Sequence, residues 1–407
     1  MDLGFSLYPL NADAPSDIVS LIQKIGADSR AAAYILPKRN VRHIYVKDAD
    51  FRACAYLKQE LLARGGDALV SRHVIDASAD KSDALLLGTD GIFAALLQKM
   101  KAMDCWGLRE LREELSRSLK NMGVRSWTFP LPEGRELALD GDTKIMGILN
   151  LTPDSFHAPS RVKDTDSLLS RADQMLKDGA DVLDIGAEST RPGSSPLPID
   201  QEIERLIPAL RELRRAFPKA VLSVDTYKGR AASAAADAGA DIINDVGGFG
   251  LDPDMLPCAA KIGLPYVLSH IKGKPRDMQD SPSYDDLLTE MNAFFHAKIE
   301  KAEKAGLPAE HIIIDPGLGF GKRTKDNLLI IKEIESFSVF GRPILLGSSR
   351  KGFIGKVSGA SRESDRLFGT AAISALTEGR VHLTRVHDVA ENKEAVRVAR
   401  AVREALE

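Results

Sequence analysis

After residue 144 the chain alternates short apolar runs with helical patterns, and this rhythm limits the possible folds more than any other feature. Runs that are short and apolar throughout are typical of strands buried on both faces of a sheet. Eight strand-then-helix units in roughly 265 residues match a (β/α)8 barrel in number and size, and a doubly wound open sheet is the alternative. The runs are 145–152, 182–189, 220–226, 242–248, 266–271, 312–320, 344–350 and 382–388.

Length and composition predict a second, smaller domain before the barrel. The 407 residues exceed one ordinary domain, and 44% apolar residues suffice for a sizeable core. Residues 129–144 hold two prolines, two glycines and many charges, which indicates a linker or a short hairpin. We therefore predict a small α/β domain of unknown role in residues 1–140 and the barrel in residues 141–407. In the first domain we expect strands at 41–46, 68–70 and 84–87, and helices over 50–64 and within 90–120.

Charge and cysteine content exclude several classes of function. Lys and Arg number 55 and Asp and Glu number 58, so the net charge of -3 favours neither nucleic acid nor an anionic membrane as a partner. The three cysteines lie far apart, which excludes a disulfide framework and a zinc ribbon and favours the reducing cytoplasm. No apolar run approaches the roughly 18 residues that cross a bilayer, and the first residues do not resemble a secretory signal.

Each of the eight runs ends in side chains capable of chemistry. In a (β/α)8 barrel these ends meet on one face, where barrel enzymes have their active sites. Carboxylates and amides can bind the N–H edge of a flat heterocycle, Lys, Arg and His can hold an anion, and glycines permit close backbone approach. The chemistry alone predicts a nitrogen-rich ring that bears a phosphate. The main candidates are Asn150, Arg191, Asp225, Asn244, Asp315, Gly317, Gly319, Gly321, Lys351, Arg385 and His387.

The motifs that carry these residues resemble dihydropteroate synthase along nearly all of 144–407. Their order and spacing are more specific than any one of them. The resemblance implies a (β/α)8 barrel that joins 6-hydroxymethyl-7,8-dihydropterin pyrophosphate to 4-aminobenzoate, giving 7,8-dihydropteroate and pyrophosphate. It also implies Mg²⁺ and commonly a homodimer. The motifs are IMGILNLTPDSF, DIGAESTRPGS, SVDTYKG, DIINDVGG, SHIKGKPRDMQ, IIIDPGLGFGK, LLGSSRKGFIG and TRVHDV.

The resemblance further implies a role for each matching residue. The pterin-binding set is Asp225, Asn244, Asp315 and Lys351, with Arg385 packed over the pterin face. The pyrophosphate set is Asn150, Arg385 and His387, with Asn150 near Mg²⁺. The 4-aminobenzoate site is bordered by Thr190, Arg191, Pro192, Phe320, Ser349 and Lys351.

Loss of pyrophosphate leaves positive charge on the methylene carbon of the pterin, which buried carboxylates would stabilise, while cations and Mg²⁺ would stabilise the leaving group. We therefore expect the catalytic residues to be Asp225, Asp315, Lys351 and Arg385.

Three positions depart from the pattern of the family. The first loop, at 155–160, lacks the usual acidic residue. Lys272 either adds charge near the pterin pocket or points outward. Gly352 replaces a serine that contacts the aminobenzoate carboxylate, which removes a hydrogen bond worth about 0.5–1.5 kcal/mol.

Other interpretations of these residues and of the whole chain stay open. Asp225 and Asp315 could cap backbone N–H groups, and His270 and His387 could be packed core histidines. The alternative functions are a pterin-binding, corrinoid-dependent methyltransferase and a non-catalytic pterin-binding protein.

Overall fold

The computed structural model describes residues 10, 12, 14–151, 161–188 and 196–405 of the 407-residue chain. These residues form two compact units, Met1–Leu119 with Ala405–Glu407, and Lys120–Glu404. Each unit has a hydrophobic core of its own. Among the described residues, no helix combines the length and the apolar character needed to cross a membrane.

The N-terminal unit is a three-stranded antiparallel sheet with the strand order β1-β3-β2. Alternate residues of β3 are buried, as expected when helices cover one face of a sheet. Leu57, Leu61, Phe93 and Leu96 from two helices form part of the core against that face. The predicted small α/β domain is therefore confirmed. Its elements are α1 (Pro15–Ile25), α2 (Ala32–Ile35), β1 (Val41–Asp50), α3 (Phe51–Leu62), β2 (Asp67–Val70), β3 (Lys81–Thr89), α4 (Asp90–Met100) and α5 (Leu108–Asn121).

The second unit is a parallel eight-stranded barrel, and each strand falls within one of the eight predicted runs or begins one residue before it. The strand order is β11-β10-β9-β8-β7-β6-β13-β12, and a single bridge between Ile314 and Ile344 joins the two ends. The barrel prediction is confirmed. The strands are β6 (Lys144–Asn150), β7 (Val182–Gly186), β8 (Val221–Asp225), β9 (Ile242–Asp245), β10 (Tyr266–Ser269), β11 (Ile312–Asp315), β12 (Leu345–Leu346) and β13 (Leu383–Val386).

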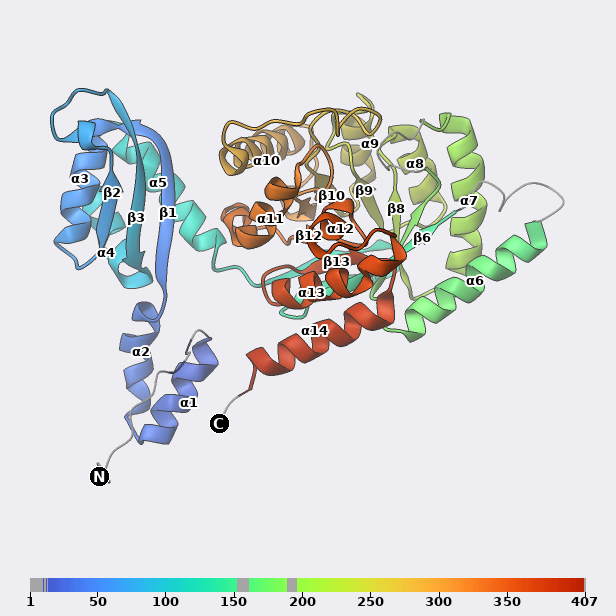
Figure 1. Cartoon of the computed structure of the whole chain (residues 1–407), viewed down its shortest axis with the longest axis horizontal. Helices are drawn as coiled ribbons and strands as arrows, with labels where there is room; N and C mark the ends of the chain where they lie inside the picture. The colour runs from blue at the N-terminus through green and yellow to red at the C-terminus, as the bar shows by residue number, and fades with distance from the viewer. Residues whose placement is uncertain (1–9, 11, 13, 152–160, 189–195, 406–407) are drawn as a thin grey trace. The chain divides into compact units, whose positions relative to one another are not determined.

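Helices surround the strands of this unit (Figure 1). Amphipathic spacing explains their packing: Leu206, Leu210 and Leu213 repeat every three or four residues on α7 and join the core with the outward residues of the strands, such as Leu222 and Val224. The helices are α6 (Arg161–Lys177), α7 (Ile199–Ala216), α8 (Gly229–Asp237), α9 (Met255–Ile262), α10 (Leu287–Lys304), α11 (Thr324–Lys332), α12 (Gly352–Ser358), α13 (Leu367–Thr377) and α14 (Val389–Arg403).

The N-terminal end of the barrel is closed by a hairpin made of β4 (Ser126–Pro130) and β5 (Glu136–Asp140). Its residues Phe129, Leu131, Leu137 and Leu139 are buried against the lowest inward-facing layer of the strands. The segment at 129–144 is thus a hairpin that packs with the barrel, so the structural units divide at Leu119 rather than at the predicted residue 140. The strand layer consists of Met146, Val182, Val221, Ile242, Val267, Ile313, Leu345 and Leu383.

A buried ion-pair cluster ties the hairpin to the barrel wall. The side chain of Asp241 is inaccessible to solvent and lies between the guanidinium groups of Arg135 on the hairpin and Arg214 on α7, each within 2.6 Å. Asp241 also accepts a hydrogen bond from the backbone N–H of Leu222 at 2.9 Å. Both carboxylate oxygens are therefore satisfied, which makes this cluster a structural one.

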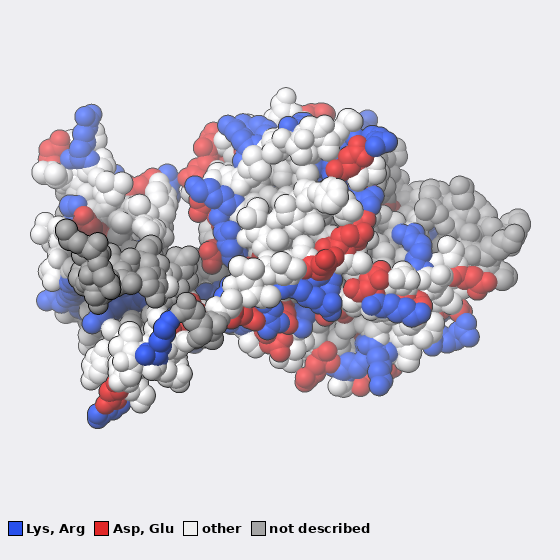
Figure 2. All heavy atoms as spheres, turned by 60° about the horizontal axis from the view of Figure 1, so that its bottom comes forward, with Lys and Arg blue, Asp and Glu red and all other residues white. Residues whose placement is uncertain are grey.

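Charge on the described surface is mixed. In the view of Figure 2, Lys and Arg side chains are interspersed with Asp and Glu. This view agrees with the net charge of -3.

Candidate active site

The opposite end of the barrel begins where the inward-facing residues change from apolar to polar. Because side chains alternate between the two faces of a strand, the residue two positions beyond the apolar layer also points inward. On seven of the eight strands the inward positions beyond that layer include a polar side chain. They line, or lie next to, a cavity of about 1400 Å³, which is large enough for two small molecules. These side chains are Asn150, Asp184, Ser223, Asp225, Asn244, Ser269, Asp315 and Arg385.

Arg385 on β13 lies between two carboxylates. Its Nε donates to Asp184 Oδ2 and its Nη2 donates to Asp225 Oδ2, both at 2.6 Å. Asn244 also donates to Asp184 Oδ2, through Nδ2 at 3.1 Å. Burial lowers the pKa of Arg385, and the two carboxylates more than offset that effect. The guanidinium therefore stays charged and is held in one orientation.

Asp225 has an environment that favours the protonated form more than water does. Burial raises the pKa of Asp225, Arg385 opposes the shift, and the nearby Asp184 carboxylate adds to it. Two acids that share one guanidinium leave this part of the site with an excess of negative charge when both are ionised. A cation or a hydrogen-bond donor in the cavity would relieve that excess.

Asp315 ends β11 and is held by its neighbours. Its Oδ1 accepts from the backbone N–H of Gly317 at 2.8 Å, and Ser269 Oγ donates to its Oδ2 at 3.3 Å. Burial raises the pKa of Asp315, against the effects of that N–H group and of Lys351. Asp315 thus combines the predicted capping contact with a place in the cavity wall.

Lys322 holds the glycine-rich loop that follows Asp315, a role that was not predicted from the sequence. Its Nζ lies 2.9–3.1 Å from four acceptors, namely His270 Nδ1 and the carbonyl oxygens of His270, Gly317 and Phe320. Burial lowers the pKa of Lys322 to about 7. A Cβ on Gly317 would lie 2.1 Å from the His270 carbonyl oxygen, so a glycine is required there.

His270 and Lys272 are placed by these contacts. His270 is buried, packs edge-on to Phe294 with ring centroids 4.8 Å apart, and has Lys322 at its Nδ1, which supports a packing role. Lys272 pairs with Glu290 at 3.1 Å and lies over the Tyr284 ring, and it is not among the residues that line the cavity. The outward alternative is therefore correct for Lys272.

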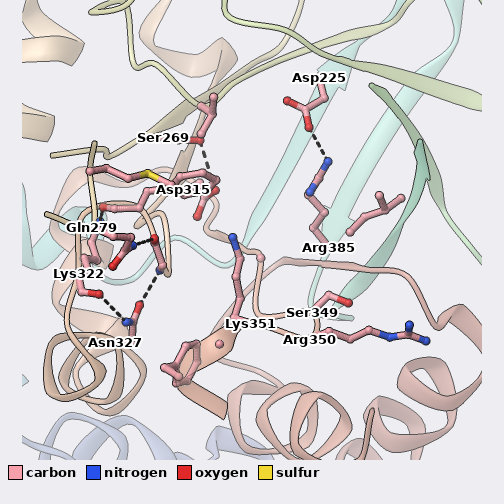
Figure 3. Close-up of a pocket in the computed structure, with 18 of the residues that line it drawn as sticks. Asp225, Ser269, Gln279, Asp315, Lys322, Asn327, Ser349, Arg350, Lys351 and Arg385 are labelled. Atoms are coloured by element: carbon pink, nitrogen blue, oxygen red, sulfur yellow. Dashed lines mark hydrogen bonds and ion pairs between the residues drawn. The ribbon is translucent and has the colours of Figure 1, made fainter. Parts of the chain in front are cut away.

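Lys351 immediately precedes α12 and extends toward the space between Asp315 and Arg385 (Figure 3). Its Nζ lies 4.2 Å from the centre of the Phe320 ring, a cation–π contact that guides the long side chain. The structure thus brings together Lys351 with the predicted residues Asp225, Asp315 and Arg385 in one cavity.

Ser349 and His387 form a linked pair beside Lys351. Ser349 Oγ accepts from the backbone N–H of His387 at 3.1 Å and lies 2.8 Å from His387 Nδ1. If the hydroxyl donates to Nδ1, the neutral ring carries its proton on Nε2. Burial lowers the pKa of His387 to about 4, so the histidine is a neutral donor near pH 7. Its neighbour Arg350 is committed to Asp388, with Nε donating to Oδ2 at 2.9 Å.

A buried lysine connects the ends of β7 and β8 on the other side of the cavity. Lys228 pairs with Glu188 and with Glu202, and its Nζ donates to the Leu197 carbonyl oxygen at 2.6 Å. Thr226 Oγ1 donates to Glu202 at 2.6 Å. The sequence contained Lys228 in the SVDTYKG motif, but a contact with residues 26 and 40 positions away has no local signal.

The structure describes only some of the remaining predicted residues. Asn150 lines the cavity at the end of β6. The described residues contain no cluster of three or more His, Cys, Asp or Glu side chains that could hold a metal ion. Thr190, Arg191, Pro192 and the altered first loop at 155–160 lie outside the described residues.

Comparison with known proteins agrees with this site. Residues 146–387 match the family described as "Pterin binding enzyme". The chain belongs to this family. It is 38% identical over 275 residues to the dihydropteroate synthase of Synechocystis, which covers 67% of this chain and 95% of that protein. A solved structure of Xanthomonas albilineans dihydropteroate synthase with 4-aminobenzoic acid has a TM-score of 0.63 and 38% identity, over 69% of this chain and 100% of that one.

The match to a second similar protein extends beyond the barrel of this chain. The chain is 38% identical over 367 residues to a probable bifunctional folylpolyglutamate synthase/dihydropteroate synthase of Halobacterium salinarum. That match covers 90% of this chain but only 43% of the relative, so the chain spans less than half of that protein's length. The match is longer than the barrel unit and therefore includes part of the N-terminal unit.

Proposed function

We propose that this chain is a dihydropteroate synthase, a transferase that joins 6-hydroxymethyl-7,8-dihydropterin pyrophosphate to 4-aminobenzoate in folate biosynthesis. The observation that carries the proposal is the division of charge within one cavity. Asp225 and Asp315 supply carboxylates at the ends of β8 and β11, whereas Ser349, Lys351 and His387 supply donors at the ends of β12 and β13. A pterin with an anionic tail has the complementary division.

The reaction breaks the bond between the pterin methylene carbon and the diphosphate oxygen, and both electrons leave with pyrophosphate. The nitrogen lone pair of 4-aminobenzoate forms the new C–N bond, and that nitrogen then transfers a proton to water or to the released pyrophosphate. Asp225 and Asp315 stabilise the positive charge that develops on the pterin, because carboxylates in a buried site act through a low dielectric. Lys351, Arg385 and the Nε2–H group of His387 stabilise the leaving group.

Positioning accounts for much of the rate, because an arylamine is a weak nucleophile. Phe320 and Lys351 are in contact before the start of α12. We place the aminobenzoate ring next to these two side chains, with its carboxylate near Gly352. The resemblance adds Thr190, Arg191 and Pro192 to this subsite.

Asn150 fits the Mg²⁺ that we expect with the diphosphate. A Mg²⁺ ion that is bound together with a phosphate ligand would need only one or two oxygen ligands from the protein. The amide oxygen of Asn150 is a hard ligand at the cavity wall, and a dedicated carboxylate cluster is not required. When bound, the metal would neutralise charge on the departing diphosphate. The homodimer and the cytoplasmic location stay predictions.

The direct test supplies the purified full-length chain with Mg²⁺, the pterin pyrophosphate and labelled 4-aminobenzoate. We expect labelled 7,8-dihydropteroate and an equal amount of pyrophosphate. A chain that binds the pterin but forms no product would support the non-catalytic alternative. Methyl transfer from methyltetrahydrofolate to a corrinoid protein, without dihydropteroate formation, would support the methyltransferase.

A further inference from the structure

Asp184 is not among the residues that line the cavity, although it contacts two that do, and no part in substrate recognition has been assigned to it. It is on β7, and its side chain is inaccessible to solvent. One oxygen, Oδ2, accepts from Arg385 Nε at 2.6 Å and from Asn244 Nδ2 at 3.1 Å. A single buried oxygen atom thus contacts two residues of the expected pterin subsite.

The contact with Arg385 determines how the guanidinium is turned. Asp184 binds Nε and Asp225 binds Nη2, so two different edges of the planar group are held. If Asp225 were the only partner, the guanidinium could rotate about its one hydrogen bond to that carboxylate. Asp184 therefore keeps the plane of Arg385 in the orientation that a flat ligand meets.

The contact with Asn244 determines which atom of the amide is available to a ligand. An ionised carboxylate can only accept, so the NH₂ group of Asn244 must face Asp184. The carbonyl oxygen of that amide is then the group left for the cavity, which Asn244 lines. An acceptor at this position selects a ligand that presents an N–H donor, as the edge of a pterin does.

Asp184 holds these partners at a cost in stability. Among the described residues its second oxygen, Oδ1, is buried without a hydrogen-bond partner, as is Oγ of Ser223, the residue paired with Asp184 on β8. A buried charged atom without a partner destabilises a fold. Asp241 at the other end of the barrel differs, because both of its oxygens accept hydrogen bonds.

We propose that Asp184 is a positioning residue, which holds the guanidinium of Arg385 and the amide of Asn244 in the orientations that recognise the pterin. It acts through these two residues and does not touch the substrate. This inference rests on the proposed function, because the ligand it concerns is the pterin pyrophosphate.

The test compares Asp184→Asn with Asp241→Asn in the full-length chain, after the wild type has been shown to form dihydropteroate. For Asp184→Asn we expect kcat/KM for the pterin pyrophosphate to fall about ten- to a hundredfold, as when a group that orients an active-site residue is altered. The KM for 4-aminobenzoate should change less than about threefold, because Asp184 does not contact that subsite. The melting temperature should stay equal or rise. Asp241→Asn should instead lower the melting temperature and leave both kinetic constants near their wild-type values.

The pH profile provides a readout that a purely structural role would not move. The groups that act on Asp225 are Arg385, Asp184, Glu202 and Lys351. Removing the negative charge of Asp184 should lower the pKa of Asp225, so the acid limb of kcat/KM should shift to lower pH. A shift to higher pH, or no shift, would contradict this expectation.

Each outcome decides between the proposals. An inactive wild type overturns the proposed function, and the positioning role with it. An active wild type with an Asp184→Asn variant that keeps wild-type kinetics and pH profile overturns the positioning role alone. Asp184→Ser serves as a second, smaller variant if the first does not fold. If neither variant folds, Asp184 is a structural residue and the inference is wrong.

Discussion

The two ends of the barrel bury similar groups in opposite proportions. At the N-terminal end one carboxylate, Asp241, lies between two guanidinium groups, and both of its oxygens are satisfied. At the C-terminal end one guanidinium group, Arg385, lies between two carboxylates, and one oxygen of Asp184 has no partner in the described structure. The first arrangement holds the hairpin against the barrel wall. The second leaves charge and hydrogen-bonding capacity for a ligand, so the difference separates a structural end from a functional one.

Removal of the hairpin from the structural end should have the most severe consequence. A fragment of residues 141–407, which follows the boundary predicted from sequence, lacks the hairpin and its four buried apolar side chains. Each such side chain contributes about 1.5–3 kcal/mol, so the loss approaches the whole free energy of unfolding of a typical domain, about 5–15 kcal/mol. We expect this fragment to be insoluble or unfolded, and a fragment of residues 120–407 to be folded, as measured by circular dichroism and thermal denaturation. A stable 141–407 fragment would mean that the hairpin is dispensable.

The functional end should show the reverse pattern. Asp225→Ala and Lys351→Ala should each lower kcat about 10²- to 10⁴-fold, because each removes charge from the reacting centre. Their melting temperatures should stay within a few degrees of the wild type, since both side chains line the cavity. Lys304→Ala, on the exposed face of α10, is the matched control and should leave kcat unchanged. Activity near wild type in either cavity variant would remove that residue from the site.

Each end of the barrel contains a partly buried histidine, and both residues should make the stability of the fold depend on pH. Burial lowers the pKa of both His382, under Trp127 near the hairpin, and His387, in the cavity, to about 4. Between pH 6.5 and 4 the unfolded chain binds protons at these residues that the folded chain does not, so stability falls as pH falls. The expected loss is on the order of 1–2 kcal/mol per histidine at pH 5, measurable by urea denaturation at pH 7 and pH 5.

Pyrophosphate distinguishes the two histidines. An anion at the cavity stabilises the imidazolium form of His387 and should raise its pKa, whereas His382 at the far end should not respond. NMR titration of the imidazole signals with and without Mg²⁺ and pyrophosphate measures this difference. Equal shifts of both residues would show that the anion acts on the fold as a whole.

The smallest expected effect is at Gly352. A Cβ there would meet no heavy atom of the described residues within 4 Å, so a serine fits among them without rearrangement. Gly352→Ser should lower the KM for 4-aminobenzoate about two- to tenfold, the equivalent of one hydrogen bond of about 0.5–1.5 kcal/mol. The KM for the pterin pyrophosphate should not change. A serine variant with unaltered KM for both substrates would place the aminobenzoate carboxylate elsewhere.

Local pattern was sufficient to predict the strands and the end of the barrel that carries the chemistry. Apolar runs reveal buried strands wherever they lie, and the barrel topology then brings their polar ends together. The pairing of Asp184 with Arg385 joins residues 201 positions apart, and that of Arg135 with Asp241 joins residues 106 positions apart. The closed barrel brings such partners together, and no spacing in the sequence predicts their contact. The same reason explains why the packing of the hairpin against the barrel was not predicted.

The bridge between Ile314 and Ile344 gives the barrel a seam. On one side of it, β11 ends in Asp315, and on the other, the two-residue strand β12 leads to Lys351. An isolated bridge thus joins the two strands that lead to these two proposed ligand-binding groups. A substrate bound to both Asp315 and Lys351 would link β11 to β12. The barrel would then be most stable when its site is occupied.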